Sequence, residues 1–240
     1  HISSIIKRGN FRNLDIKGIN STYEETYLSI LTGYEQDELE ITSKNYYADI
    51  SFFEQVKQYS PSINTVVLFT PPDDPNSEPV VMNLMTSLVD KNATFSSIKA
   101  RTSYQIGLDT SAVISDITSP FVIFINYTNI DRVGRRYREG GELYSQAILN
   151  CNRSIGLILN ALEENNTLEN TDILITTTYG MKEKTKYASE FSWVISSKKT
   201  QRKGVIQDIV PSLYDLLDIR PINNEYFGKS IFKFSEKKTL

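Results

Sequence analysis

The amino-acid sequence predicts an α/β protein, because strand-like and helix-like stretches alternate along it. Residues 121–125 (FVIFI) form an unbroken apolar run, which is typical of a strand buried on both faces of a parallel sheet. Over residues 142–162, apolar side chains recur at helical spacing. Residues 173–177 (ILITT) give a second strand signal that ends before Gly180. A loop after the first strand and a right-handed crossover through the helix would place both strands in one sheet.

The other elements follow from apolar patterns and turn residues. Residues 50–59 predict a helix with Phe52, Phe53, Val56 and Tyr59 on one face, and residues 64–69 (NTVVLF) predict a buried strand. A Pro-, Asp- and Ser-rich stretch at 71–79 predicts a surface loop. Further elements are expected as helices at 80–89, 104–117 and 208–219 and as a short strand at 191–196.

The composition is that of an ordinary globular protein. Of the 240 residues, 40% are hydrophobic and 23% are charged, which excludes a disordered chain. The net charge of −3 provides no basic footprint for nucleic acid, so we expect no nucleic-acid partner. No apolar run reaches the ~20 residues that span a bilayer, so no membrane span is expected. Cys151 is the only cysteine, so no internal disulfide can form, and we expect it to be an inert packing residue.

Several short motifs occur in a fixed order along the chain. They read Asp131-Arg-Val-Gly134-Arg135, Asn152-Arg-Ser-Ile155-Gly156, Thr178-Tyr179-Gly180-Met181, the segment at 208–219 and Gly228-Lys229-Ser230. This order resembles the alkaline phosphatase superfamily, nearest to its type I phosphodiesterase/nucleotide pyrophosphatase branch, with the ethanolamine-phosphate transferases next. The resemblance implies a three-layer α/β/α sandwich with a mostly parallel central sheet, in one alkaline phosphatase-like domain over residues 1–240. The family's first strand ends in Asp-Gly, and nothing before Ser21 supplies it, so we expect this chain to lack that strand.

The resemblance implies two-zinc phosphoryl transfer, but the ligands that such chemistry needs are largely missing. Asp131 matches a metal-binding Asp, whereas Arg135 stands where a ligand His belongs, and a guanidinium has no lone pair to donate. Thr178 and Tyr179 stand where an Asp-His pair would bind the second metal. The only histidine is His1, so the three His ligands cannot be supplied. We therefore expect no zinc cofactor.

A helix that ends at Thr32-Gly33 places the family's nucleophile at Thr22 or Tyr23, and the usual spacing points to Tyr23. A hydroxyl at a helix N-terminus lies beside unpaired N–H groups that favour phosphate. The alternative is that Ser21 or Thr22 is simply an N-cap. We regard Thr22 as the degenerate nucleophile position.

Asp131 is predicted to be a turn residue or an ion-pair partner of Arg132, Arg135 or Arg136 rather than an occupied metal ligand. We favour the hypothesis that Arg135 places its own charge where a metal would otherwise bind. A remnant pocket of Arg135, Arg136, Thr178 and Tyr179 would then remain as a binding site.

The sequence therefore favours a catalytically inactive phosphodiesterase-like domain that acts as a binding or scaffold protein. Its expected partner is another protein, or a small anion such as phosphate held by Thr22, Arg135 and Arg136. The alternative is a metal-dependent phosphodiesterase that uses Thr22 and Asp131 around Mg²⁺ or Mn²⁺. A doubly wound nucleotide-binding domain is disfavoured because no Gly-rich loop follows any predicted strand.

Five N-x-S/T sequons favour a glycoprotein of the secretory pathway or the extracellular space. They begin at Asn20, Asn92, Asn126, Asn152 and Asn165.

Overall fold

The computed structural model describes residues 1–16, 23–34, 51–69, 91–94, 102–185, 189, 191–220 and 228–233. The predicted loop at 71–79, the predicted helix at 80–89 and Thr22 lie outside these residues. The chain divides into two compact units, the first built mainly from Val56–Thr171 and the second from Ser3–Gln55, Asp172–Gly180 and Ser189–Leu240. No helix among the described residues has the length and apolarity needed to cross a membrane.

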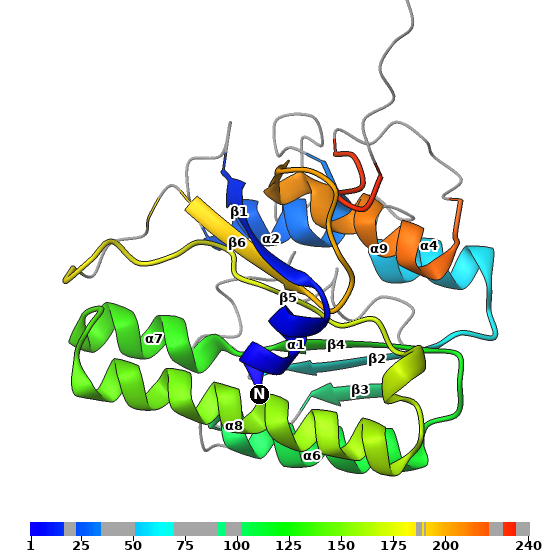
Figure 1. The fold of residues 1–240 in the computed structure, drawn as a ribbon, viewed down its shortest axis with the longest axis horizontal. Helices are drawn as coiled ribbons and strands as arrows, with labels where there is room; N and C mark the ends of the chain where they lie inside the picture. Colours follow the sequence, from blue (N-terminus) through cyan, green and yellow to red (C-terminus); the bar gives the residue numbers. More distant parts are fainter. Residues whose placement is uncertain are drawn as a thin grey trace, which may run out of the picture. The chain divides into compact units, whose positions relative to one another are not determined.

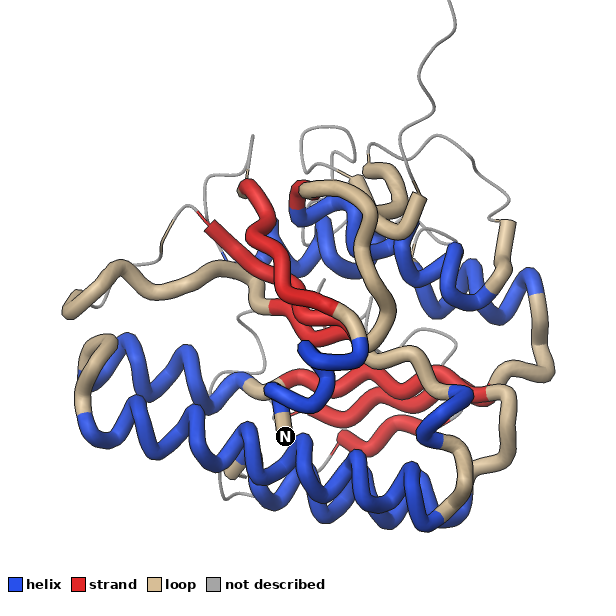
Figure 2. Tube along the Cα trace, in the orientation of Figure 1, coloured by secondary structure: helices blue, strands red, loops and turns tan. Residues whose placement is uncertain are grey.

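The first unit contains a parallel sheet of three strands, β2 (Asn64–Phe69), β3 (Lys91–Thr94) and β4 (Phe121–Asn126), in the order β3-β2-β4 (Figures 1 and 2). The central strand β2 is buried as predicted, with Val66, Val67 and Leu68 at most 1% exposed. The prediction that residues 121–125 are buried on both faces is wrong, because they are only half-buried. The reason is that β4 is an edge strand of this sheet, paired with β2 alone in the described part of the chain.

Two helices of the first unit, α6 (Ser103–Asp116) and α8 (Glu142–Glu164), lie side by side next to this sheet (Figure 1). Both helices were predicted, α8 from its apolar periodicity. They approach closely at Gly107, where a Cβ atom would lie 2.5 Å from Ser154 Oγ and 2.8 Å from its Cα. The buried face of α8 includes Cys151 and Ile155, whereas Leu143, although part of the predicted apolar face, is 52% exposed.

A further helix, α7 (Thr128–Tyr137), occupies the stretch after β4 that the sequence predicts as a loop. The prediction fails because this stretch is short and dense in charge, which obscures the helical spacing of Ile130, Val133 and Tyr137. It folds as a helix because α7 packs against α8, with which it forms a hairpin (Figure 1). Asp131, Arg135 and Arg136 therefore lie on a helix rather than on a loop.

The second unit contains a sheet in the order β5-β6-β1-β7, made of β1 (Asn10–Asp15), β5 (Leu174–Thr176), β6 (Phe191–Ser196) and β7 (Gly204–Val205). β6 is antiparallel to both β1 and β5, and β7 is parallel to β1. The prediction that residues 121–125 and 173–177 share one sheet is therefore wrong, because β4 hydrogen-bonds to β2 and β5 to β6. Over the described residues the strand pairing is mixed rather than mostly parallel.

The helices of the second unit include α1 (Ile2–Arg8), α2 (Tyr23–Thr32) and α9 (Ile209–Leu217). α4 (Phe52–Tyr59) begins in this unit with a capping box, in which Ser51 Oγ accepts from the Glu54 N–H at 3.1 Å and Glu54 Oε2 accepts from the Ser51 N–H at 3.0 Å. The predicted face of α4 is buried except for Tyr59, which is 48% exposed.

Asp208 connects α9 to the segment 228–233. Its Oδ2 accepts from the Val205 N–H at 2.8 Å and its Oδ1 accepts from the Lys229 N–H at 2.6 Å. The Arg202 Nη2 lies 2.9 Å from the same Oδ1, and Arg202 Nε donates to the Ser230 carbonyl at 3.0 Å. Asp208 is 2% exposed, so this charge is removed from water and held by these donors.

Candidate functional site

Asp131 and Arg135 form an ion pair on α7. Arg135 Nε donates to both carboxylate oxygens of Asp131, at 2.8 Å to Oδ2 and 3.1 Å to Oδ1. The two residues are one helical turn apart, so their side chains meet on one face of the helix. The remaining carboxylate of the D-x-x-G-R motif is thus occupied by the guanidinium that stands in the place of a ligand His.

Gly134, in the same motif, allows α7 to approach α8. A Cβ atom here would lie 3.1 Å from Tyr144 Cε2 and 3.3 Å from Met181 Cε. Burial, followed by the carboxylates of Glu139 and Asp131, raises the pKa of Tyr144. Tyr144 therefore stays neutral near neutral pH beside this ion pair.

A hollow of about 290 Å³ lies beside the ion pair and is lined by Arg132, Val133, Arg136 and Tyr137. Arg132 Nη2 donates to Asn129 Oδ1 at 3.0 Å, and the Arg136 Cζ lies 5.4 Å from the centre of the Tyr137 ring. Sequence reasoning named Arg136 but missed the contribution of Arg132 and Tyr137. The spacing of Arg132 and Arg136 was the available signal, and it is informative only if the stretch is helical.

Thr178 and Tyr179 lie in the second unit, in the loop after β5. Thr178 is half-buried and Tyr179 is 5% exposed. The loop is tied to its surroundings, since Thr177 Oγ1 donates to the Tyr179 carbonyl at 2.8 Å and the Gly180 N–H donates to the Phe191 carbonyl at 2.9 Å. Tyr179 is therefore a buried side chain of a fixed loop.

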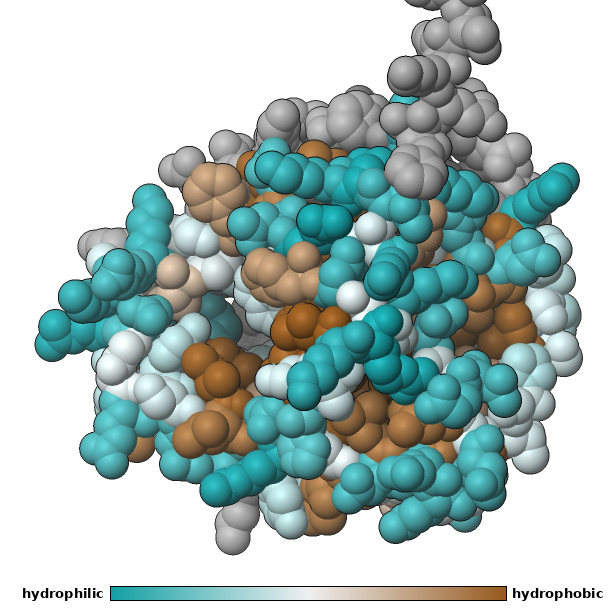
Figure 3. All heavy atoms as spheres, viewed as in Figure 1, coloured by the Kyte–Doolittle hydropathy of each residue, from teal (hydrophilic) through white to brown (hydrophobic). Residues whose placement is uncertain are grey.

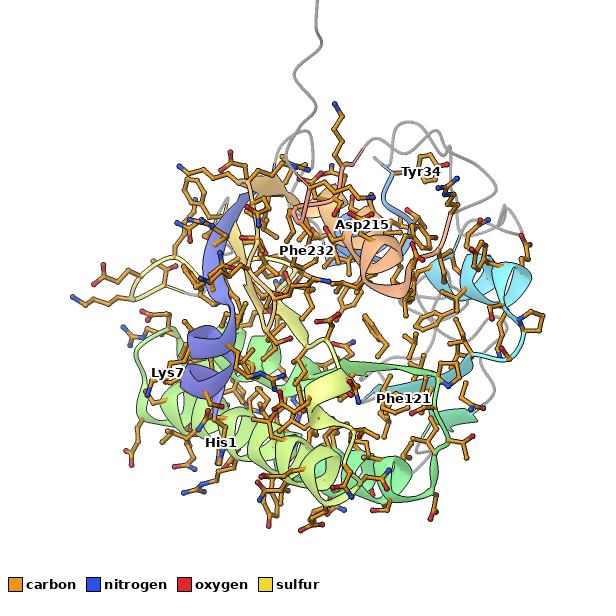
Figure 4. All side chains as sticks on the ribbon, turned by 45° about the vertical axis from the view of Figure 1, so that its right-hand side comes forward. His1, Lys7, Tyr34, Phe121, Asp215 and Phe232 are labelled. Atoms are coloured by element: carbon orange, nitrogen blue, oxygen red, sulfur yellow. The ribbon has the colours of Figure 1, made fainter. Side chains whose placement is uncertain are left out.

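The N-terminal residue lies against the middle of α8 (Figure 4). A Cβ atom at Gly156 would lie 2.4 Å from His1 Nε2, and the Ile2 N–H donates to Asn152 Oδ1 at 3.1 Å. Gly156 is the glycine of the second motif, so its lack of a side chain makes room for the imidazole. Within the described part of the chain, no group of three or more His, Cys, Asp or Glu side chains could hold a metal ion.

A buried polar cluster lies between α6, α8 and the start of α7. The hydroxyls of Tyr127 and Ser154 are 2.7 Å apart. Burial raises the pKa of Tyr127, with a smaller opposing effect of the Ser154 hydrogen bond. Burial also raises the pKa of Cys151 to about 12. The thiol therefore remains protonated near neutral pH, and the expectation of a buried packing residue is confirmed.

The sequence matches the family model of type I phosphodiesterase / nucleotide pyrophosphatase over residues 26–229, which is most of the chain. The chain belongs to this family. The resemblance inferred from its motifs is thereby confirmed. None of the curated proteins matches the sequence.

Solved structures of low sequence identity share the fold. The lipoteichoic acid synthase LtaP from Listeria monocytogenes is 12% identical, with a TM-score of 0.67, and the match covers 96% of this chain and 68% of that one. The putative sulfatase yidJ from Bacteroides fragilis is 13% identical, with a TM-score of 0.65, and the match covers 100% of this chain and 74% of that one. The phosphonate monoester hydrolase SpPMH from Silicibacter pomeroyi is 11% identical, with a TM-score of 0.54, and the match covers 88% of this chain and 66% of that one. These likenesses confirm the predicted alkaline phosphatase-like α/β fold, here with mixed strand pairing.

In this member of the phosphodiesterase family, the glycines that remain in the motifs lie where other groups pack closely. The absence of a side chain at Gly134 leaves room for Tyr144, and at Gly156 it leaves room for His1. A Cβ atom at Gly180 would lie 2.9 Å from Ser189 Oγ. The two zinc ions that the family resemblance implies do not fit the described residues, because Arg135 is hydrogen-bonded to both oxygens of Asp131 and no three or more His, Cys, Asp or Glu side chains among these residues form a group that could hold a metal ion.

Proposed function

We propose that this chain is a catalytically inactive member of the type I phosphodiesterase/nucleotide pyrophosphatase family that acts as a binding or scaffold protein. The observation that carries the proposal is the contact of Arg135 Nε with both carboxylate oxygens of Asp131. A guanidinium is positively charged at all physiological pH values and donates hydrogen bonds without accepting any. It therefore neutralises the carboxylate that a metal would need and offers no ligand in return.

The pattern of retained and lost motif residues supports the same proposal. Gly134 and Gly156 serve packing, whereas Arg135, Thr178 and Tyr179 replace residues of the metal-binding chemistry. A chain that keeps the family's fold but lacks its metal ligands is consistent with a protein that uses its surface for binding. Another protein is the partner class that we propose, and a small anion near Arg135 and Arg136, with Thr22, is the narrower candidate.

A turnover assay tests this proposal. The purified chain should hydrolyse a nitrophenyl phosphodiester no faster than Thr22→Ala and Asp131→Ala variants, with zinc, magnesium or manganese added. The physical reason is that activation of the hydroxyl and stabilisation of the leaving group would both require bound metal.

The assay also distinguishes the alternative enzyme. Metal-dependent turnover that is lost in both Thr22→Ala and Asp131→Ala would contradict the proposal and support a phosphodiesterase with a non-standard site. An Arg138→Ala variant serves as the control for unspecific effects, because Arg138 is exposed and lies just after the end of α7.

A further inference from the structure

Three of the five N-x-S/T sequons have asparagine side chains that the structure describes, and their surroundings differ. They are the sequons of Asn126, Asn152 and Asn165. An N-linked glycan is a bulky, hydrated group that has to remain outside the folded chain. The asparagine that carries it must therefore be exposed in the fold, with open space around it. This condition separates the three positions.

Asn126 and Asn152 do not meet the condition. Asn126 is the last residue of β4 and is only 7% exposed. Asn152 is half-buried in the middle of α8, where its Oδ1 accepts from the Ile2 N–H at 3.1 Å. The third residue of its sequon, Ser154, is buried, with its hydroxyl 2.7 Å from that of Tyr127. A glycan at Asn126 would displace packed groups, and a glycan at Asn152 would crowd the N-terminal segment that lies against α8.

Asn165 does meet the condition. It is the exposed C-cap residue of α8, and its neighbours Glu163, Glu164 and Asn166 are exposed as well. The chain turns away from the helix at this point, since Asn166 has a φ of +55°. The surface over this end of α8, at the lower right of the view in Figure 3, is hydrophilic. A glycan attached here would extend into solvent.

The amide nitrogen of Asn165 can carry a sugar and keep its structural contact. Its Nδ2 donates to the Ile114 carbonyl at 2.7 Å, which connects the C-terminal ends of α8 and α6. A primary amide has two N–H donors, and this contact uses one of them. Glycosyl transfer from a polyprenyl-diphosphate oligosaccharide breaks the bond between the sugar C1 and the phosphate oxygen, forms the Nδ2–C1 bond and releases one amide proton. The diphosphate leaves with the bonding electron pair, and the second N–H remains to donate to Ile114.

We propose that Asn165 carries an N-linked glycan. Thr167 completes its sequon with the hydroxyl that the acceptor motif requires. The proposal uses the secretory route that the sequons favour, and it does not depend on the loss of catalysis. Because a glycan would cover the adjoining ends of α6 and α8, the protein partner proposed above would bind to another part of the surface.

Peptide mapping tests the proposal on the whole chain, produced in cultured animal cells behind a cleavable secretion signal. A Lys or Arg residue separates each sequon from the next, so trypsin places every sequon on a peptide of its own. Enzymatic removal of N-glycans in heavy-oxygen water converts each glycosylated asparagine into a labelled aspartate. The label should occur at position 165 and should be absent from Asn126 and Asn152. An unlabelled Asn165 would overturn the proposal, and so would equal labelling of Asn126 and Asn152, because exposure in the fold would then not decide the site.

Variants of the third sequon residue show whether the label at position 165 depends on the acceptor motif. Thr167→Ala should lose the label and the corresponding glycan mass, whereas Thr167→Ser should keep both because it retains the hydroxyl. Asn166→Gln is the matched control, since the middle position of a sequon accepts any residue except proline. It should be labelled as the unchanged chain is. A label that persists in Thr167→Ala, or that is lost in Asn166→Gln, would overturn the proposal.

Discussion

Replacing Asp208 by alanine is expected to lower the free energy of unfolding by about 3–5 kcal/mol, the usual cost of removing one partner of a buried ion pair. The change would leave the Arg202 guanidinium, which is 24% exposed, without its carboxylate. It would also remove the acceptor of the Val205 and Lys229 N–H groups. Urea denaturation followed by circular dichroism measures the effect.

The exposed pair on α7 supplies the comparison. The side chains of Arg135 and Asp131 are 51% and 31% exposed, so Asp131→Ala should change the free energy of unfolding by no more than about 1 kcal/mol. If Asp208→Ala costs no more than Asp131→Ala, then Asp208 does not hold the segment 228–233 in the way described. The pair of variants therefore separates a structural carboxylate from a surface one.

Replacing Gly9 by alanine is expected to destabilise the chain by about 3 kcal/mol or more, because the added methyl group would overlap fixed backbone. Gly9 lies between α1 and β1, and a Cβ atom there would be 2.0 Å from the Ser196 carbonyl oxygen and 2.7 Å from the Ser197 carbonyl carbon. These atoms belong to the end of β6 and the residue after it, so they cannot rotate away as a flexible side chain could. Thermal and urea unfolding measure the loss.

Gly140→Ala is the matched variant for Gly9→Ala. Gly140 has a φ of +78° and no atom within 4 Å of an added Cβ. Gly140→Ala should lower the free energy of unfolding by only about 1–2 kcal/mol, the cost of holding a residue with a side chain in a left-handed backbone conformation. Similar losses in the two variants would show that the contact between Gly9 and β6 is looser than the structure indicates.

Apolar pattern was sufficient to predict the elements that carry a buried face of their own. β2 was found in this way, since the compact apolar run at 64–69 predicts a buried strand and Val66, Val67 and Leu68 are buried. Strand partners were not predictable, because the alternation of side chains does not encode which edge a strand pairs with. β5 pairs with β6 rather than with β4 for this reason.

Only those parts of the candidate site were predictable that depend on the identity of single residues and not on how the chain folds. Arg135 in place of a ligand His was evident from the sequence, but its contact with Asp131 required α7 to be a helix. The hollow of Arg132, Arg136 and Tyr137 depends on the same helix and was missed. Asp208 was assigned only to a structural helix, because its partners Arg202 and Lys229 are contributed by separate segments.

The central claim is that Arg135 has taken the place of a metal at Asp131, and metal analysis tests it most directly. The protein would be dialysed against zinc, then against zinc-free buffer, and its metal content measured. We expect substoichiometric zinc in both the unchanged chain and an Asp131→Asn variant, because the carboxylate is already bound by the guanidinium. One or more zinc ions retained per chain, and lost in Asp131→Asn, would contradict the account and show that Asp131 is still a metal ligand.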